Sequence, residues 1–161
     1  PGIRDFCLSR GLGDVYKRQS LNSHVLAALI KKIVLAKKQN KKSFIVWGTG
    51  RPRREFLHVD DLADATVKIM NLSKSKYNKV AGEKFPFINV GSGSDISVKD
   101  LAKLISKIVE FKGKMIFDKS KPDGTFRKLM DNTKLRKIKW KPKISLNSGI
   151  KKTIEDFKAT I

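Results

Sequence analysis

The sequence predicts an α/β domain in which helices and short strands alternate along one chain. Stretches with apolar residues at helical spacing alternate with short β-branched and aromatic runs, and turns containing glycine or proline separate them. The chain has 161 residues, of which 40% are hydrophobic, enough for one core of ordinary size. We therefore expect one compact domain and not a disordered chain.

The first two regular elements are a helix and a strand. Residues 20–38 carry apolar side chains at helical spacing, and Asn22 or Ser23 is a suitable N-cap, which places His24 in the first turn. Residues 42–47 then alternate into a short buried strand. Trp47 at its end is either a core aromatic residue or a ligand contact.

The middle of the chain is predicted to hold a second helix, a loop and a second strand. The helix covers residues 60–72, and Asp60 and Asp61 cap its start. Residues 73–84 are polar and rich in lysine, the composition of an exposed loop. Residues 85–90 then form a strand. The preceding His58 has a structural role in this interpretation.

The last part of the chain is predicted to hold three helices and one strand. Ser97 caps a helix, with Asp100 three residues on. A strand follows at residues 114–117, then a short helix and turn within residues 129–140. Residues 144–157 form the final helix, with one apolar side.

Two bends combine turn residues with positive charge. Residues 47–54 contain two glycines, a proline and three arginines, and residues 118–131 contain the turn Pro122-Asp123-Gly124 among basic residues. Arginine forks beside a glycine-rich turn suit an anion such as phosphate. A solvated basic turn is the alternative for the second bend.

Four segments together resemble the extended short-chain dehydrogenase/reductase family. The segments are Asn22-Ser23-His24-Val25, the stretch from Val46 to Asp61, Ile88-Asn89-Val90-Gly91-Ser92-Gly93, and the stretch from Phe117 to Thr125. The similarity runs from about residue 22 to the end of the chain. It is greatest to an epimerase-reductase of this family that converts GDP-4-keto-6-deoxymannose to GDP-L-fucose. The resemblance implies the C-terminal substrate-binding lobe of such an α/β enzyme, with the N-terminal Rossmann half absent.

The resemblance also implies roles for individual residues. His24 would be the acid/base of the epimerisation and a contact to the cofactor NADP, whereas the residues alone favour a surface cap. Five positions would contact the GDP-sugar substrate: Lys32, Trp47, Arg54, Lys114 and Asp123. Asp123 would bind a ribose or base edge, and Arg127 or Lys128 would approach phosphate. Lys114 is otherwise an ordinary solvated lysine. Neither the resemblance nor the residue spacing implies a metal.

Two motifs that this family requires are missing. The dinucleotide needs a glycine-rich turn between a strand and a helix, and carbonyl chemistry needs a Tyr-x-x-x-Lys pair. Gly11-Leu12-Gly13 lacks a third glycine, and no lysine follows Tyr16 at the fourth position. We therefore expect NADP to bind to the missing half, and the fragment alone to be inactive. Residues 1–19 match nothing in the family and are interpreted as a non-native or disordered leader, with residues 20–161 as the nucleotide-sugar domain.

The net charge of +21 suggests a different class of function, nucleic-acid binding. Thirty-six Lys and Arg residues against fifteen Asp and Glu would suit a basic nucleic-acid-binding domain. The lysines are scattered without aromatic platforms, so we expect a solvated surface and no nucleic-acid partner. Another nucleotide-sugar epimerase or dehydratase is the nearer alternative. The single cysteine and the lack of a long apolar run predict a cytoplasmic protein without membrane contact, and the resemblance implies a homodimeric parent.

Overall fold

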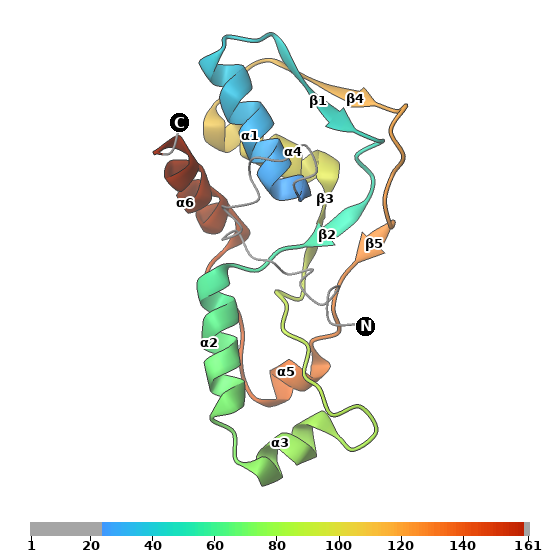
Figure 1. The fold of residues 1–161 in the computed structure, drawn as a ribbon, viewed down its shortest axis with the longest axis vertical. Helices are drawn as coiled ribbons and strands as arrows, with labels where there is room; N and C mark the ends of the chain where they lie inside the picture. The colour runs from blue at the N-terminus through green and yellow to red at the C-terminus, as the bar shows by residue number, and fades with distance from the viewer. Residues whose placement is uncertain (1–23, 160–161) are drawn as a thin grey trace.

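The computed structural model describes residues 24–159 and confirms the α/β class (Figure 1). In chain order its elements are α1 (Val25–Lys38), β1 (Ser43–Trp47), β2 (Arg53–Glu55), α2 (Val59–Met70), α3 (Lys74–Ala81), β3 (Asp95–Ser97), α4 (Val98–Val109), β4 (Lys114–Asp118), β5 (Arg127–Lys128), α5 (Thr133–Lys137) and α6 (Leu146–Lys158). The leader predicted at residues 1–19 lies outside the described residues and stays a prediction.

One end of the elongated molecule is a layered body made of α1, β1, α4, β4 and α6 (Figure 1). The strands β1 and β4 pair in parallel, which requires the long crossover that contains β2 to α4. Phe44 and Val46 point inward from β1 and are buried in a cluster with the apolar faces of α1, α4 and α6. The predicted apolar side of α6 lies in this core, formed by Ile150, Ile154 and Phe157.

The opposite face of the β1–β4 sheet carries exposed apolar side chains. Ile45 and Ile116 are register neighbours, and their side chains are 48% and 49% exposed. Parallel sheets are normally covered on both faces. Within residues 24–159, this face therefore lacks the cover that a parallel sheet usually has.

The other end of the molecule is an arm built from α2, α3 and α5 (Figure 1). Its smaller cluster of buried residues consists of Leu57, Ala65, Leu135, Ile138 and Trp140. Between body and arm lies a short sheet of order β3-β2-β5, in which β2 is antiparallel to β3 and parallel to β5. This small sheet fixes the position of the arginine-rich segment relative to the body.

Hydrogen bonds from side chains to the backbone hold the arm together. The Lys134 ammonium group donates to the carbonyls of Ala81, Phe85 and Phe87. The buried Asp61 carboxylate accepts from the backbone N–H groups of Lys143 and Ile144, at 3.0 and 2.9 Å. Such bonds satisfy backbone groups that have no partner in a helix or strand.

Two predictions for the arm were wrong. Most of residues 73–84 form the helix α3, whose start is capped by Ser73 Oγ and whose C-cap is Gly82. Residues 85–90 are not a strand, because the Phe85 and Phe87 carbonyls accept from Lys134 and make no sheet ladder within the described chain.

Two helix starts also differ from the prediction. His24 itself is the N-cap of α1, in place of Asn22 or Ser23. His58 caps α2 through Nδ1, which accepts from the Asp60 N–H, so the acidic pair does not cap that helix. The predicted structural role of His58 is confirmed, as is the Ser97 cap of α4. Among residues 24–159, every helix is too short or too polar to cross a bilayer.

Candidate functional site

The two bends predicted from the sequence meet in the structure. The irregular part of the first bend (residues 47–54) is residues 48–52 after β1, and in the second bend (residues 118–131) it begins with residues 119–125 after β4. Asp123 accepts a hydrogen bond from Thr49 N at 2.8 Å and another from Thr49 Oγ. Gly48 has φ +77°, and a Cβ there would lie 2.2 Å from Asp123 Oδ1. Only glycine therefore permits this approach of the two bends.

The Asp123 carboxylate is the anion that the first bend holds. The Thr49 hydroxyl, together with the Thr49 N–H, lowers the pKa of Asp123, because both stabilise its charged form. The glycine-rich turn therefore binds a carboxylate of the chain itself where the sequence suggested a phosphate. The predicted contact of Asp123 with a ribose or base edge stays a prediction.

Trp47 lies at the carboxyl end of β1, beside these bends. Its side chain is 52% exposed, so the alternative of a core aromatic residue is wrong. The Lys32 ammonium group lies 4.7 Å from the ring centroid, and that of Lys121 lies 6.0 Å from it. Lys32 also donates to the Ile45 carbonyl at 3.2 Å. One exposed indole ring is thus accompanied by two lysines from different elements.

Arg54 connects β2 to the second bend. Its Nη1 donates to the Thr125 carbonyl at 2.6 Å and to the Arg53 carbonyl at 2.7 Å. A Cβ on Gly124 would lie 3.1 Å from Nη2. Among the described residues, the N–H groups on Nε and Nη2 make no hydrogen bond, which leaves part of the guanidinium fork for a ligand.

Arg53 and Arg127 bind a carboxylate of the protein. Both donate to Asp95, Arg53 at 2.8 Å, and Asp95 has a side chain that is only 5% exposed. Arg127 lowers the pKa of Asp95 most, and Arg53 lowers it further. This triad joins the three strands of the small sheet. Arg127, which was predicted to approach phosphate, therefore binds Asp95 in the structure.

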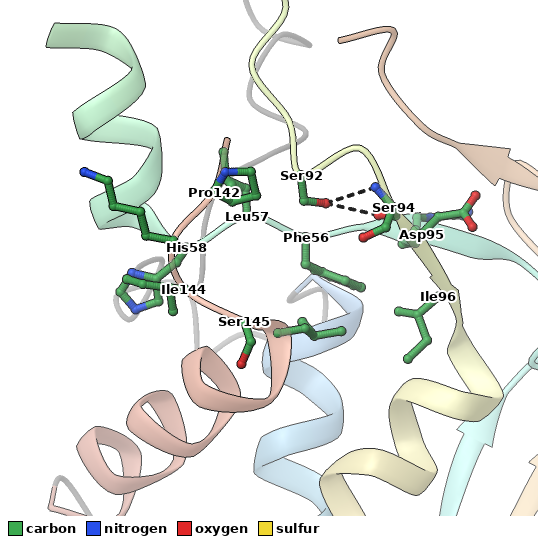
Figure 2. Close-up of a pocket in the computed structure, with 13 residues that line it drawn as sticks. Phe56, Leu57, His58, Ser92, Ser94, Asp95, Ile96, Pro142, Ile144 and Ser145 are labelled. Carbon is green, nitrogen blue, oxygen red and sulfur yellow. Dashed lines mark hydrogen bonds between the residues drawn. The ribbon is translucent and has the colours of Figure 1, made fainter. Parts of the chain in front are cut away.

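A cavity of about 310 Å³ lies next to Arg54. Figure 2 shows Phe56 and His58 from the β2–α2 connection, with Ile144 and Ser145 at the start of α6. Ser92 lines the opposite side and donates to the Ser94 carbonyl at 3.1 Å (Figure 2). The lining combines apolar side chains with polar and charged ones, among them Arg54, Asp95 and Lys143.

The remaining predicted residues lie at two other places. His24 is exposed at the start of α1, eight residues before Lys32, or roughly 12 Å along the helix axis. Lys114 pairs with Ser43 at the beginning of the strands, the end opposite to Trp47 and Asp118. The structure thus brings Lys32, Trp47, Arg54 and Asp123 to one side, with His24 further along α1, and leaves Lys114 apart.

Two contacts of this region were not predicted from the sequence, the bond from Thr49 to Asp123 and the approach of Lys121 to Trp47. Thr49 lies between two glycines, where its partner is 74 residues away and no local pattern indicates it. Lys121 shares a bend with Asp123, but no spacing rule relates it to Trp47. Across residues 24–159, no three His, Cys, Asp or Glu side chains gather in a way that could hold a metal ion.

Known proteins are similar to most of this chain. Residues 8–91 match the NAD dependent epimerase/dehydratase family. A putative GDP-L-fucose synthase 2 of Arabidopsis thaliana is 50% identical over 134 residues, which are 83% of this chain and 38% of that protein. The GDP-L-fucose synthase of Escherichia coli K12 is 44% identical over 136 residues, which are 84% of this chain and 42% of that protein.

One solved structure has a similar fold over most of this chain. The GDP-mannoheptose C4 reductase of Campylobacter jejuni, determined with NADP bound, matches with a TM-score of 0.73 and 38% identity. The match covers 88% of this chain and 46% of the reductase. The chain therefore spans less than half the length of these relatives.

Proposed function

The chain belongs to the NAD-dependent epimerase/dehydratase family, and on that premise we propose that it is the substrate-binding part of an NADP-dependent epimerase-reductase. The proposed product is GDP-L-fucose, after which its relatives are named, and the proposed substrate is GDP-4-keto-6-deoxymannose. The observation that carries this proposal is the meeting of the two bends beside an exposed Trp47.

Each part of the nucleotide sugar has a suitable group in this arrangement. Arg54 offers the unused side of its guanidinium fork to a phosphate, and Lys32 offers a second positive charge. Trp47 offers an apolar ring on which a base or sugar can pack. Asp123 holds the two bends together through Thr49, so it positions these groups whether or not it also contacts the ribose.

His24 is the proposed acid/base for the sugar and a contact to the cofactor. Its exposed imidazole stands at the N-terminus of α1. An unprotonated imidazole at that position is able to accept a proton from a sugar carbon next to a carbonyl. This role is carried by the resemblance, since the described residues include no partner that orients the ring.

The described residues do not fit a cradle for the NADP pyrophosphate. The Gly48-Thr49-Gly50 turn leads into the strand β2 and not into a helix, and its Thr49 N–H is used by Asp123. We therefore propose no hydride transfer by this chain alone. We propose that the chain alone does not reduce the keto sugar, and that the parent enzyme is a cytoplasmic homodimer.

Binding of GDP to the purified chain tests this proposal. We expect calorimetry to detect GDP binding that weakens about tenfold in Arg54→Ala and in Trp47→Ala, because each removes a direct contact. Lys107→Ala, an exposed lysine on α4, is the matched control and should bind GDP like the unmodified chain.

The same experiment separates the proposal from a nucleic-acid-binding function. A basic nucleic-acid-binding domain would bind arbitrary duplex DNA tightly, with a steep salt dependence that GDP does not relieve. That result, or a lack of GDP binding by the unmodified chain, would contradict the proposed substrate. Oxidation of NADPH by the chain alone with the keto sugar would contradict the proposed inactivity.

A further inference from the structure

We propose that Lys121 is a further substrate contact, which binds the diphosphate of the nucleotide together with Lys32 beside the Trp47 ring. This inference rests on the proposed function and extends it to a residue outside the predicted substrate contacts. Lys121 lies in the second bend, and its ammonium group is 6.0 Å from the indole centroid.

Three separate elements bring these groups to one place. Lys32 comes from α1, Trp47 ends β1, and Lys121 follows β4. Trp47 is the register partner of Asp118, and a turn in which Lys121 N donates to the Asp118 carbonyl at 3.3 Å reverses the chain after β4. This turn directs Lys121 back toward the indole ring. Because both ammonium groups lie within 6.0 Å of the same centroid, one molecule on the indole can contact both.

The charges of this region favour an anion. Lys32, Lys121, Arg51 and Arg54 supply four positive charges, and Asp118 and Asp123 supply two negative charges. Each carboxylate is already engaged, Asp118 by the Ser120 N–H and hydroxyl and Asp123 by Thr49. The local excess of positive charge is therefore not balanced by these two acids, and a diphosphate would neutralise it.

The charged neighbour of Lys121 is Asp118, whose pKa is lowered mainly by the Ser120 hydroxyl and to a smaller degree by the charge of Lys121. Among the described residues Lys121 forms no salt bridge, whereas Lys32 donates to the Ile45 carbonyl. Burial lowers the pKa of Lys32, and the nearby Asp118 partly opposes this effect. A phosphate beside Lys32 would act in the same direction as Asp118 and favour the charged ammonium form.

Calorimetric titrations with GDP, guanosine and inorganic pyrophosphate test the role of Lys121. In Lys121→Ala we expect affinity for GDP and for pyrophosphate to fall about three- to tenfold, as for the loss of one exposed charge contact, with affinity for guanosine unchanged. Lys121→Arg, which keeps the charge, should restore most of the affinity. Lys119→Ala, in the same bend, is the matched control and should bind all three ligands like the unmodified chain.

Each other outcome overturns the inference. If Lys121→Ala binds GDP like Lys119→Ala while Arg54→Ala is weakened, Lys121 is not a contact and the proposed function stands. If Lys121→Ala loses guanosine as strongly as GDP, the lysine supports the indole ring and does not bind phosphate. If the unmodified chain binds no GDP, the proposed function fails and the inference fails with it.

Discussion

The layered body and the arm of this molecule are stabilised in different ways. In the body, three helices and the β1–β4 sheet share one large apolar cluster, and backbone groups pair within regular elements. In the arm, the apolar cluster is small, and polar side chains such as Lys134 and Asp61 bind backbone groups of irregular segments. The body is therefore stabilised mainly by the burial of apolar side chains, and the arm mainly by specific polar contacts.

The largest effect is expected from a cavity in the body. Leu101 on α4 is fully buried, and Leu101→Ala should lower the free energy of unfolding by about 3 to 5 kcal/mol. The equivalent change in the arm is Leu135→Ala, whose side chain is 1% exposed but belongs to the smaller cluster. We expect it to cost about 2 kcal/mol. Urea unfolding followed by circular dichroism measures both, and equal costs would remove the proposed difference between the regions.

A smaller and local effect is expected from Lys134→Met. This change keeps the apolar stem but removes the donor for three carbonyls, at a cost of about 1 to 3 kcal/mol. Amide hydrogen exchange should become faster in α3, with the protection of α4 unchanged. Lys137→Met on the same helix is the control. Faster exchange throughout the body would show that arm and body unfold as one unit.

The smallest effect is expected from the acid titration of Asp64. The Lys143 ammonium group is the main cause, ahead of the Trp140 indole, that lowers the pKa of Asp64. A lowered pKa in the folded state means that the charged Asp64 stabilises the fold above its unfolded pKa. This contribution is lost as the pH falls through the folded pKa.

The substitution Asp64→Asn tests this predicted dependence of stability on pH. The variant should be less stable than the unmodified chain at neutral pH, and the difference should disappear in acid, when measured as the unfolding midpoint from about pH 7 down to about pH 2. Glu83→Gln, an exposed acid in the arm, should follow the unmodified chain at every pH. A stability difference that grows in acid would contradict the assignment.

The sequence predicted the body better than the arm for a physical reason. Residues such as Leu101 and Ile105 recur at helical spacing because a helix face is buried, so the spacing reveals the helix. The helix α3 is short and lysine-rich, and its cap at Ser73 and the bond from Tyr77 to the Pro86 carbonyl leave no periodic pattern. The wrong loop and strand predictions both fall in this region.

At the candidate site, too, the sequence predicted some features and missed others. The family resemblance indicated Trp47, Arg54 and Asp123, and the structure brings the bends that carry them together. It could not indicate that Asp123 binds Thr49 or that Lys121 lies beside Trp47, because these contacts join residues 74 positions apart along the chain. Lys114, predicted on the same basis, lies at the other end of its strand.

The uncovered Ile45 and Ile116 face has a practical consequence for handling the protein. Apolar faces and open strand edges promote aggregation, but a net charge of +21 makes copies of the chain repel each other. Added salt screens that repulsion and leaves the hydrophobic attraction in place. Solutions of the chain should therefore be clear in dilute buffer and turn cloudy as ionic strength rises.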